Sequence, residues 1–375
     1  MKVATGLAIG AIAKPQLAAN AVQAAMAKAG ITSASSVLLF LTSEFAADPQ
    51  SAIKAAAKTA QCTQVIGCSA TGIFTEEDWV IDSPAAAAMV FSGLNFSHSH
   101  INSIANTGAK PNTMANNSHL LLTLTAPNAV NTTWLNSPAI RRFGGVSGDA
   151  NGQGPFSVWE NGKGVTQGYS EVMLQNTIGA VAATHGLKLI SSPRKITANN
   201  AYDILTVGNL TALSNLQSAC QKHAQSKTNL PYHQLMAVHA SKAVQIERGE
   251  YNLASLISGN DENASVTLAK KLQVGDWLSW AIRDCDAAQI DIVKTTNALK
   301  RQLHADPAFA LLFSCLGRGP YFYNGIDQDL ALIKTLLPKL PIIGFYGNGE
   351  IAPINGVNEL LQYSAVLGLF ADGIH

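Results

Sequence analysis

The sequence predicts a mixed α/β protein in which two related domains pack together, built from repeated strand–helix–strand–Gly-turn–strand units. Three features predict this fold class: short apolar runs typical of buried strands, helical segments between them, and a glycine-rich segment after the second strand of each unit. At 375 residues the chain is longer than the roughly 250–300 residues that one hydrophobic core serves. We therefore expect domains at residues 1–198 and 199–375, joined near residues 191–200.

The first predicted unit lies between residues 37 and 91. Residues 37–42 (VLLFLT) form a continuous apolar strand, and Asp48-Pro49 then provides a cap and a first-turn proline for a helix over residues 51–59. A second strand over residues 64–66 leads into a turn over residues 67–72, and residues 85–91 return as a third strand. One such unit cannot close its own core, so several units are expected to pack together.

The same order of elements recurs near the C-terminus and, in a weaker form, in the middle of the chain. The C-terminal unit has strands at residues 310–314, 341–343 and 363–370, a helix at 327–337 and a turn at 344–349. The middle unit has a strand at residues 120–125, a turn at 142–149 and a hairpin around Asn161-Gly162. In the second half we also expect a helix at residues 210–223 and strands at 235–238, 244–247 and 277–281.

Composition excludes several functional classes. Only 13% of the residues are charged, the formal net charge is +1, and there is no dense Lys/Arg run, which argues against nucleic acid and acidic membranes as partners. No apolar run reaches the roughly 18–20 residues of a membrane-spanning helix, and we expect no signal peptide. Five scattered cysteines without a C-x-x-C pair indicate reduced thiols, so we expect a cytoplasmic protein without a metal site or cofactor.

The glycine-rich segments are the candidate binding elements. Glycine at both ends of residues 67–72 and 344–349 is expected to permit a sharp turn with positive φ and a close approach of ligand to backbone N–H groups. A phosphate-binding loop is excluded, because Ile73 and Glu350 stand where Lys and Ser or Thr would be required. The alternative interpretation is that these segments are only tight turns of a repeated fold.

Polar residues cluster at these segments and, if the units converge, would meet at one rim. They are Cys68, Ser69, Thr71, Arg142, Ser147, Asp149, Cys315, Arg318, Tyr346, Asn348 and Glu350. Such a rim suits a small zwitterion or carboxylate: Arg142 and Arg318 would hold an acidic group, while Asp149 and Glu350 would hold a basic one. The hydroxyl and amide side chains would add neutral hydrogen bonds. The alternative for each charged residue is a structural ion pair.

Cysteine chemistry offers a competing interpretation. Cys68 or Cys315 could act as a nucleophile in a thiol-dependent amidohydrolase or transferase, but neither has a histidine nearby in sequence to activate it. The pair His98 and His100 would need further ligands to hold a metal, and a solvated strand end is the simpler reading. We therefore favour a protein that is not an enzyme.

Three stretches of the sequence are distinctive in combination: VIGCSATGIFTEEDW from residue 65, ALLFSCLGRGPYFY from residue 310 and PIIGFYGNGEIAP from residue 341. Together they resemble the FIST family of sensory domains (F-box and intracellular signal transduction proteins). The resemblance implies a FIST N-terminal domain followed by a FIST C-terminal domain, no established catalytic machinery, and small-molecule sensing with amino acids as ligands. Many members of that family carry His where this chain has Leu361, and some carry Glu where it has Ile73.

Taken together, these features predict a small-molecule-binding sensory protein that recognises an amino acid or a related small zwitterion or carboxylate. No signalling module is expected in this chain, so the signal would pass to a partner protein. Two alternatives stay open: the thiol-dependent enzyme, and a protein-binding scaffold without a ligand.

Overall fold

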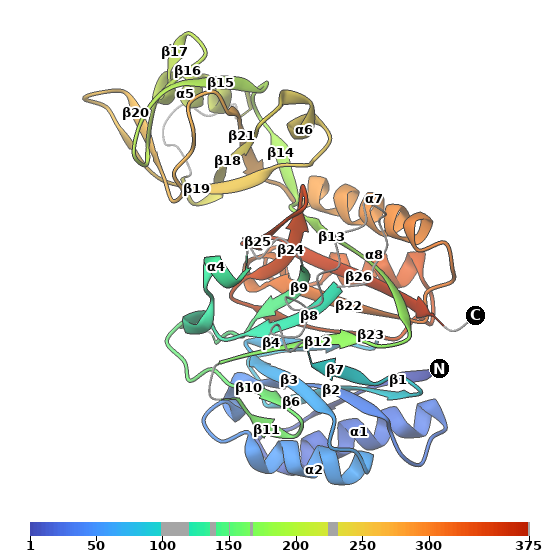
Figure 1. Ribbon diagram of the computed structural model, residues 1–375. Coiled ribbons are helices and arrows are strands. Elements are labelled where there is room, and N and C mark those ends of the chain that lie inside the picture. Colours follow the sequence, from blue (N-terminus) through green and yellow to red (C-terminus); the bar gives the residue numbers. More distant parts are fainter. Residues whose placement is uncertain (99–119, 136–139, 150, 166–167, 224–231, 374–375) are drawn as a thin grey trace, which may run out of the picture. The chain divides into compact units, whose positions relative to one another are not determined.

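The computed structural model describes residues 1–373 except 99–119, 136–139, 150, 166–167 and 224–231, and the chain forms two compact units. Unit 1 comprises Met1–His185 and Ile292–His375, and unit 2 comprises Gly186–Asp291. The mixed α/β fold class is confirmed by mixed sheets with helices packed on them (Figure 1). The predicted boundary at residues 198 and 199 falls inside a strand of unit 2, β15 (Arg194–Asn200).

Unit 1 contains three six-stranded sheets with the strand orders β1-β6-β2-β3-β10-β11, β13-β26-β22-β23-β4-β5 and β7-β12-β8-β9-β24-β25. Sheet 1 consists of β1 (Lys2–Ile9), β6 (Ala85–Ser92), β2 (Ser36–Thr42), β3 (Val65–Ala70), β10 (Val158–Glu160) and β11 (Lys163–Gly164). Sheet 2 consists of β13 (Thr177–Thr184), β26 (Ala365–Asp372), β22 (Phe309–Cys315), β23 (Ile342–Gly347), β4 (Gly72–Thr75) and β5 (Trp79–Ile81). Sheet 3 consists of β7 (Phe96–His98), β12 (Tyr169–Leu174), β8 (Leu120–Thr125), β9 (Arg141–Val146), β24 (Glu350–Ile354) and β25 (Val357–Leu361).

The three sheets share one plan. Each has one parallel pair at its centre: β2 with β3, β22 with β23, and β8 with β9. The second strand of each pair then crosses into the next sheet: β3 leads to β4 in sheet 2, β23 leads to β24 in sheet 3, and β9 leads to β10 in sheet 1. The three crossings therefore form a closed cycle. That the sheets arose from one repeated sequence unit stays a prediction.

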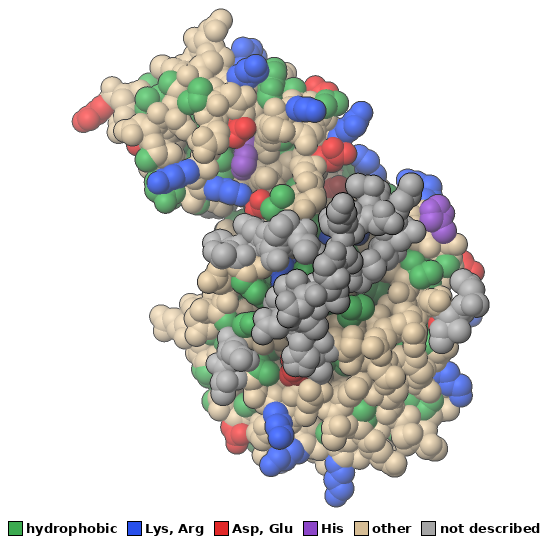
Figure 2. Space-filling model, in the orientation of Figure 1, with side chains coloured by type: hydrophobic (Ala, Val, Ile, Leu, Met, Phe, Trp, Pro, Cys, Tyr) green, Lys and Arg blue, Asp and Glu red, His purple; other side chains and the backbone are tan. Residues whose placement is uncertain are grey.

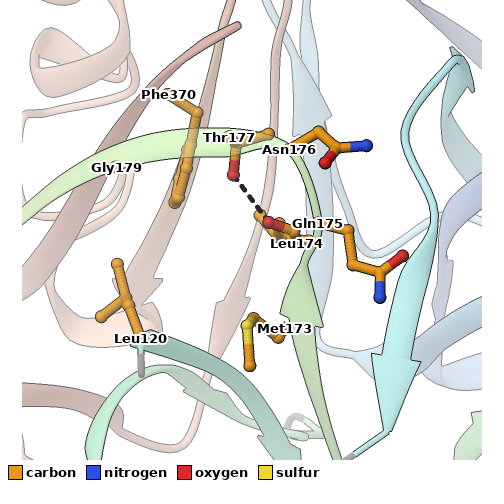
Figure 3. Close-up of a pocket in the computed structure, with 8 residues that line it drawn as sticks. All are labelled: Leu120, Met173, Leu174, Gln175, Asn176, Thr177, Gly179 and Phe370. Carbon is orange, nitrogen blue, oxygen red and sulfur yellow. Dashed lines mark hydrogen bonds between the residues drawn. The ribbon is translucent and has the colours of Figure 1, made fainter. Parts of the chain in front are cut away.

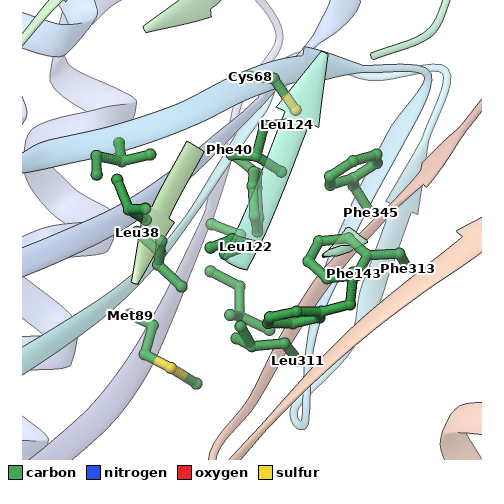
Figure 4. Close-up of a cluster of buried hydrophobic side chains, with 14 of the residues drawn as sticks. Leu38, Phe40, Cys68, Met89, Leu122, Leu124, Phe143, Leu311, Phe313 and Phe345 are labelled. Carbon is green, nitrogen blue, oxygen red and sulfur yellow. The ribbon is translucent and has the colours of Figure 1, made fainter. Parts of the chain in front are cut away.

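One apolar core lies between the three sheets. Phe40 of sheet 1 packs with Phe345 of sheet 2 at a ring-centroid separation of 5.0 Å, and Phe143 of sheet 3 packs with Phe313 at 6.2 Å (Figure 4). All four rings are buried. Edge-on and tilted aromatic pairs of this kind stabilise a core beyond the burial of their area.

Helices cover the outer faces of sheets 1 and 2 (Figure 1). Sheet 1 carries α1 (Pro15–Ala29) and α2 (Gln50–Ala60), whose alanine-rich faces allow close packing on the sheet. Sheet 2 carries α8 (Gln328–Leu336) and the C-terminal part of α7 (Cys285–Leu303). The short helices of unit 1 are η1 (Ser43–Phe45), η2 (Pro127–Ala129), α4 (Thr132–Leu135) and η4 (Leu316–Arg318).

The turns predicted over residues 67–72 and 344–349 are largely wrong, because most of these residues belong to strands. Gly349, between β23 and β24, does have the expected positive φ. β3 runs through Ala70 and β23 through Gly347, so only one or two residues separate each from the strand that follows. Gly67 and Gly344 do not have positive φ. A Cβ atom at Gly67 would lie 1.6 Å from the Leu39 carbonyl oxygen, and one at Gly344 would lie 1.8 Å from that of Leu312. Glycine is needed here for close approach of two strands.

Sheet 3 repeats this arrangement at Gly144, where a Cβ atom would lie 1.9 Å from the Thr123 carbonyl oxygen. Gly144 pairs with Thr123 across the parallel pair, as Gly67 pairs with Leu39 and Gly344 with Leu312. The three glycines therefore occupy equivalent positions in the three sheets.

Unit 2 is built on antiparallel strands. Its elements are β14 (Leu187–Leu189), β15, β16 (Asp203–Val207), β17 (Leu210–Thr211), α5 (Ala212–His223), η3 (Tyr232–Gln234), β18 (Leu235–Ala240), α6 (Ala243–Glu247), β19 (Asn252–Asn260), β20 (Ser265–Leu268) and β21 (Trp277–Arg283). The sheet order β21-β15-β16-β20-β19-β18 closes on itself, because β18 also pairs with β21. Apolar side chains from α5 and these six strands form one core.

Two local predictions had different outcomes. The hairpin at Asn161-Gly162 is confirmed: both residues have positive φ, and β10 pairs with β11. The strand predicted over residues 244–247 is wrong, because this segment forms α6. The Gln245 side chain accepts a hydrogen bond from the Lys242 backbone N–H at 3.0 Å, which stabilises the start of a helix.

Two further properties concern candidate partners. None of the helices in the described part of the chain is long and apolar enough to cross a membrane. On the face shown in Figure 2, the Lys and Arg side chains lie in several small groups rather than in one continuous band.

Substituting Gly344→Ala should lower the free energy of unfolding by about 3 kcal/mol, because the new methyl group would force β22 and β23 apart. Gly164→Ala is the control, since no atom of the described residues beyond its chain neighbours lies within 4 Å of its Cβ position. Urea denaturation followed by circular dichroism measures both. Equal stability of the two variants would show that the close approach at Gly344 is not required.

Candidate functional site

The three crossings bring predicted site residues together at one place. The Ser69 and Ser147 hydroxyl oxygens lie 3.1 Å apart, and the Ser147 hydroxyl donates to the Ser69 carbonyl at 2.6 Å. A Cβ atom at Gly148 would lie 2.9 Å from both Thr71 Oγ1 and Asn348 Oδ1. We call Ser69, Thr71, Ser147 and Asn348 the crossing cluster. Thr71 Oγ1 is buried and has no hydrogen-bond partner among the described residues.

Asp149 follows the crossing cluster but is engaged by its own loop. Its carboxylate accepts hydrogen bonds from the backbone N–H groups of Gly152 at 2.5 Å and Gly154 at 2.9 Å. This pattern is typical of an aspartate that orders a turn. The structure therefore gives Asp149 a local structural contact rather than an open carboxylate.

A second cluster lies at the carboxyl ends of β22 and β23, where ligands commonly bind in sheets with parallel strands. Glu350 begins β24, two residues separate it from the end of β23, and its side chain is fully buried. Neither carboxylate oxygen has a hydrogen-bond partner within the described part of the chain. Burial raises the pKa of Glu350 well above its ordinary value. The Ser364 backbone, which approaches the carboxylate without meeting hydrogen-bond geometry, and the charge of Arg318 oppose that shift.

The surroundings of Glu350 are polar and buried. The His185 ring Nδ1 lies 3.0 Å from the Ser364 hydroxyl oxygen, and Thr184 Oγ1 is buried without a partner among the described residues. The Thr184 carbonyl accepts a hydrogen bond from Arg318 at 2.8 Å. We call Thr184, His185, Arg318, Glu350 and Ser364 the Glu350 cluster.

Arg318 is held by a carboxylate of the protein itself. Its Nε donates to Asp329 Oδ2 at 2.8 Å, and the Tyr323 hydroxyl donates to the other oxygen at 2.8 Å. Both ionic side chains are almost fully buried, with relative exposures of 1% and 2%. This contact favours the structural ion-pair interpretation of Arg318, although its charge still acts on Glu350.

Tyr346 connects the same region to α8. Its hydroxyl donates to the carboxylate of Asp327, which caps α8 by accepting from the Leu330 N–H at 2.9 Å. Burial and then the charge of Asp329 raise the pKa of Asp327 to about 6. Burial also raises the pKa of Tyr346 well above its usual value, so the phenol stays protonated and acts as the donor.

Arg142 belongs to a separate ion pair within sheet 3. Its Nε donates to Glu171 Oε1 at 2.6 Å, its Nη1 donates to the Leu135 carbonyl at 3.3 Å, and its guanidinium lies 5.2 Å from the centre of the Trp134 ring. The side chain is completely buried. These contacts, like those of Arg318, favour the structural alternative.

The two candidate nucleophiles lie in different settings. Cys68 is fully buried in the central core, and burial raises the pKa of its thiol well above the usual value, which opposes formation of a thiolate. Cys315 ends β22 and is 9% exposed, and its backbone N–H donates to the Ser364 carbonyl at 3.0 Å. No group of three or more His, Cys, Asp or Glu side chains among the described residues could hold a metal. The side chains of His98 and His100 lie outside the described residues.

A cavity of about 370 Å³ lies at the opposite ends of the parallel strands. Leu120, Met173 and Phe370 line it, with the turn amides of Gln175 and Asn176 (Figure 3). None of the predicted site residues lines this cavity. Because none of its described lining residues is charged, we place the candidate site at the carboxyl ends, where Glu350 lies.

Several residues of this region were missed by sequence reasoning. Thr184 and Asp329 contact the predicted Arg318, from 134 and 11 positions away along the chain. His185 contacts Ser364, which is 179 positions away from it. A sequence signal existed only for Asp329, which follows the helix-capping Asp327 by two residues.

Comparison with known families gives the class of protein. Residues 35–208 match the FIST N domain and residues 212–353 match the FIST C domain. The chain belongs to the FIST family, whose domains act as sensory domains in signal transduction. The resemblance noted in the sequence is thereby confirmed.

Similar proteins occur in mycobacteria. An uncharacterized protein of Mycobacterium tuberculosis is 26% identical over 387 residues, which cover 99% of this chain and 100% of that protein. An uncharacterized protein of Mycobacterium bovis is 26% identical over 320 residues, covering 82% of this chain and 83% of that protein.

Substituting Arg318→Met should lower the free energy of unfolding by about 3–5 kcal/mol, because it leaves Asp329 buried without its cation. The double variant Arg318→Met/Asp329→Leu should recover most of that loss, since no uncompensated charge remains. Urea denaturation of both variants measures the difference. If the double variant is no more stable than the single one, the uncompensated charge of Asp329 is not the cause of the lost stability.

Asp327 should make stability fall as the pH rises from about 4 to about 6. In this window the unfolded chain releases the carboxyl proton while the folded protein, with its raised pKa, retains it. Asp327→Asn should flatten this fall by roughly 1–3 kcal/mol and keep the cap of α8. Asp327→Ala should remove the slope but lose about 1 kcal/mol at every pH through loss of the cap. Denaturation midpoints at pH 4 and pH 7 measure the pH dependence of stability in each variant. If that dependence is unchanged in both variants, groups other than Asp327 cause it.

Proposed function

We propose that this protein is a cytoplasmic sensory protein that binds an amino acid or a related small zwitterion at the Glu350 cluster and relays the binding to a partner protein. One observation carries the proposal: Glu350 is fully buried, and neither of its carboxylate oxygens has a partner among the described residues. A buried carboxyl group in this state is costly unless a ligand completes it. Membership of a sensory family supports the same conclusion.

The chemistry of Glu350 selects the ligand group. An ammonium group offers three hydrogen-bond donors and a positive charge, which matches two free carboxylate oxygens. Its charge would lower the pKa of Glu350, so that binding releases the carboxyl proton. Asn348 lies two residues before Glu350 in sequence, and Thr71 lies beside Asn348 in the crossing cluster. Both would supply neutral hydrogen bonds.

The ligand's acidic group would lie toward Arg318. The charge of Arg318 reaches Glu350, whereas its hydrogen bonds are made with Asp329 and the Thr184 carbonyl. Arg318 would therefore act on the ligand through its charge. Arg142 is enclosed by Glu171 and the Leu135 carbonyl, and we assign it a structural role.

Leu361 lies directly opposite Glu350 in the β24–β25 pair and is buried. A leucine offers no hydrogen bond, and for this reason the carboxyl group stays available to a ligand. Where members of the family carry a histidine at this position, the imidazole would compete for the same carboxylate. The difference points to a ligand specificity particular to this chain.

A thermal-shift screen against amino acids, simple amines and small carboxylic acids tests the proposal. A ligand of the native state raises the melting temperature in a saturable manner that follows RT ln(1 + [L]/Kd). We expect such a shift with amino acids, and we expect it to be lost in Glu350→Gln but retained in Glu44→Gln, whose side chain is exposed. A shift that survives Glu350→Gln would exclude this site, and a flat response across the library would exclude the ligand class.

Without ligand, Glu350→Gln should be more stable than the natural protein near pH 7 by roughly 1–3 kcal/mol. The raised pKa means that the folded protein retains a proton that the unfolded chain releases above pH 4.5, so stability falls as the pH rises. The difference should shrink toward pH 4. A less stable Glu350→Gln protein at neutral pH would show that the carboxyl group already has a partner.

A further inference from the structure

Unit 2 contains two neighbouring polar side chains, each with one buried atom that has no hydrogen-bond partner among the described residues. His239 of β18 and Asn252 of β19 are directly opposite each other in the antiparallel pair. His239 is only 8% exposed. The His239 Nε2 and Asn252 Oδ1 atoms are both buried, and neither has a hydrogen-bond partner in the described part of the chain.

Both side chains point into the closed sheet of unit 2. Residues two apart along a strand share a face, and Ala237 and Ala254 both belong to the interior core. His239 and Asn252 therefore lie on the inner face, at the end of β18 and the beginning of β19. On its other side His239 is opposite Leu278, whose side chain is also part of the interior core.

The imidazole is uncharged at neutral pH. Burial and then the charge of Lys270 lower the pKa of His239 to about 4. Neutral imidazole Nε2 can donate one hydrogen bond as N–H, and Asn252 Oδ1 can accept one. An unmet hydrogen-bonding group in the interior destabilises the protein, and a bound molecule that satisfies it would recover that loss.

The surroundings favour a neutral ligand over a charged one. The Ala269 N–H donates to the Ser255 carbonyl at 2.9 Å, which brings the segment after β20, including Lys270, alongside β19. The positive charge of Lys270 acts on His239 and would repel a cation. The unpartnered oxygen of Asn252 would repel an anion. A hydroxyl or a carboxamide avoids both repulsions because it is uncharged. It can accept a hydrogen bond from His239 and donate one to Asn252.

We propose that His239 and Asn252 form a binding site for a small neutral molecule that carries a hydroxyl or carboxamide group. The ligand oxygen accepts from His239 Nε2–H, and the ligand O–H or N–H donates to Asn252 Oδ1. Leu278, opposite His239 on β21 and part of the interior core, offers an apolar contact to a short aliphatic body. This site lies within unit 2 and does not depend on the Glu350 cluster of unit 1.

The test uses the full chain labelled with ¹⁵N-histidine and three probes of similar size: propionamide, propionate and propylammonium. The His239 ring signal, one of nine histidines, is identified by its loss in His239→Gln. We expect propionamide to shift this signal in a saturable manner and the two charged probes to give no saturable shift. Asn252→Leu should weaken propionamide binding by about tenfold or more, which corresponds to about 1.4 kcal/mol.

Asn252→Ser provides a second variant that also lacks the amide oxygen, in case leucine disturbs the fold. If either variant retains the native histidine spectrum and binds propionamide more weakly, the result supports the site. The absence of a saturable shift with propionamide would mean that only water occupies the position, and would overturn the proposal. Equal binding by a folded Asn252 variant, or preferential binding of a charged probe, would overturn it as well.

Discussion

The structure of unit 1 depends on a close approach between neighbouring strands that only glycine permits. Gly67, Gly144 and Gly344 each lie against a carbonyl oxygen of the first strand in their parallel pair. This contact fixes the position of the second strand beside the first. It therefore also fixes where the second strand ends. Because each second strand continues into the next sheet, the three contacts together determine where the crossings meet. The polar residues of the crossing cluster and Glu350 follow directly after these positions.

Buried charge distinguishes the candidate site from the rest of the core. Arg142 and Arg318 are each neutralised by one carboxylate, from Glu171 and Asp329, and these pairs satisfy their hydrogen-bonding groups within the protein. Glu350 has no such partner among the described residues, and Leu361 opposite it supplies none. A fully paired network stabilises a single arrangement, whereas an incomplete one leaves free energy available for binding. In unit 2 the unpaired groups are neutral instead, so the two proposed sites call for chemically different ligands.

Much of the fold could be predicted from the sequence, because strands buried on both faces appear as continuous apolar runs, as in residues 120–125 and 310–314. The glycine segments were recognised but misinterpreted as turns, since a sequence does not show that a glycine contacts a carbonyl 28 residues earlier, as Gly67 does. Ser69, Thr71, Ser147 and Asn348 were predicted and lie together. The partners of Arg142 and Arg318 were not, because residues such as Glu171 meet them only through tertiary packing. The sequence also does not show that the chain returns to unit 1 after unit 2, because unit 1 is defined only when its two chain segments pack together.

The division of unit 1 into two chain segments has a consequence for biosynthesis. β22, β23 and β24 follow unit 2 in the chain, yet β4 and β9 need β23 and β24 as hydrogen-bonding partners. During translation, sheets 2 and 3 therefore remain incomplete while the ribosome makes unit 2, whose strands are contiguous and can pair as soon as they emerge. For that interval the apolar face of sheet 1 lacks the phenylalanines that later cover it. The nascent chain is consequently expected to depend on chaperones until its last segment is released.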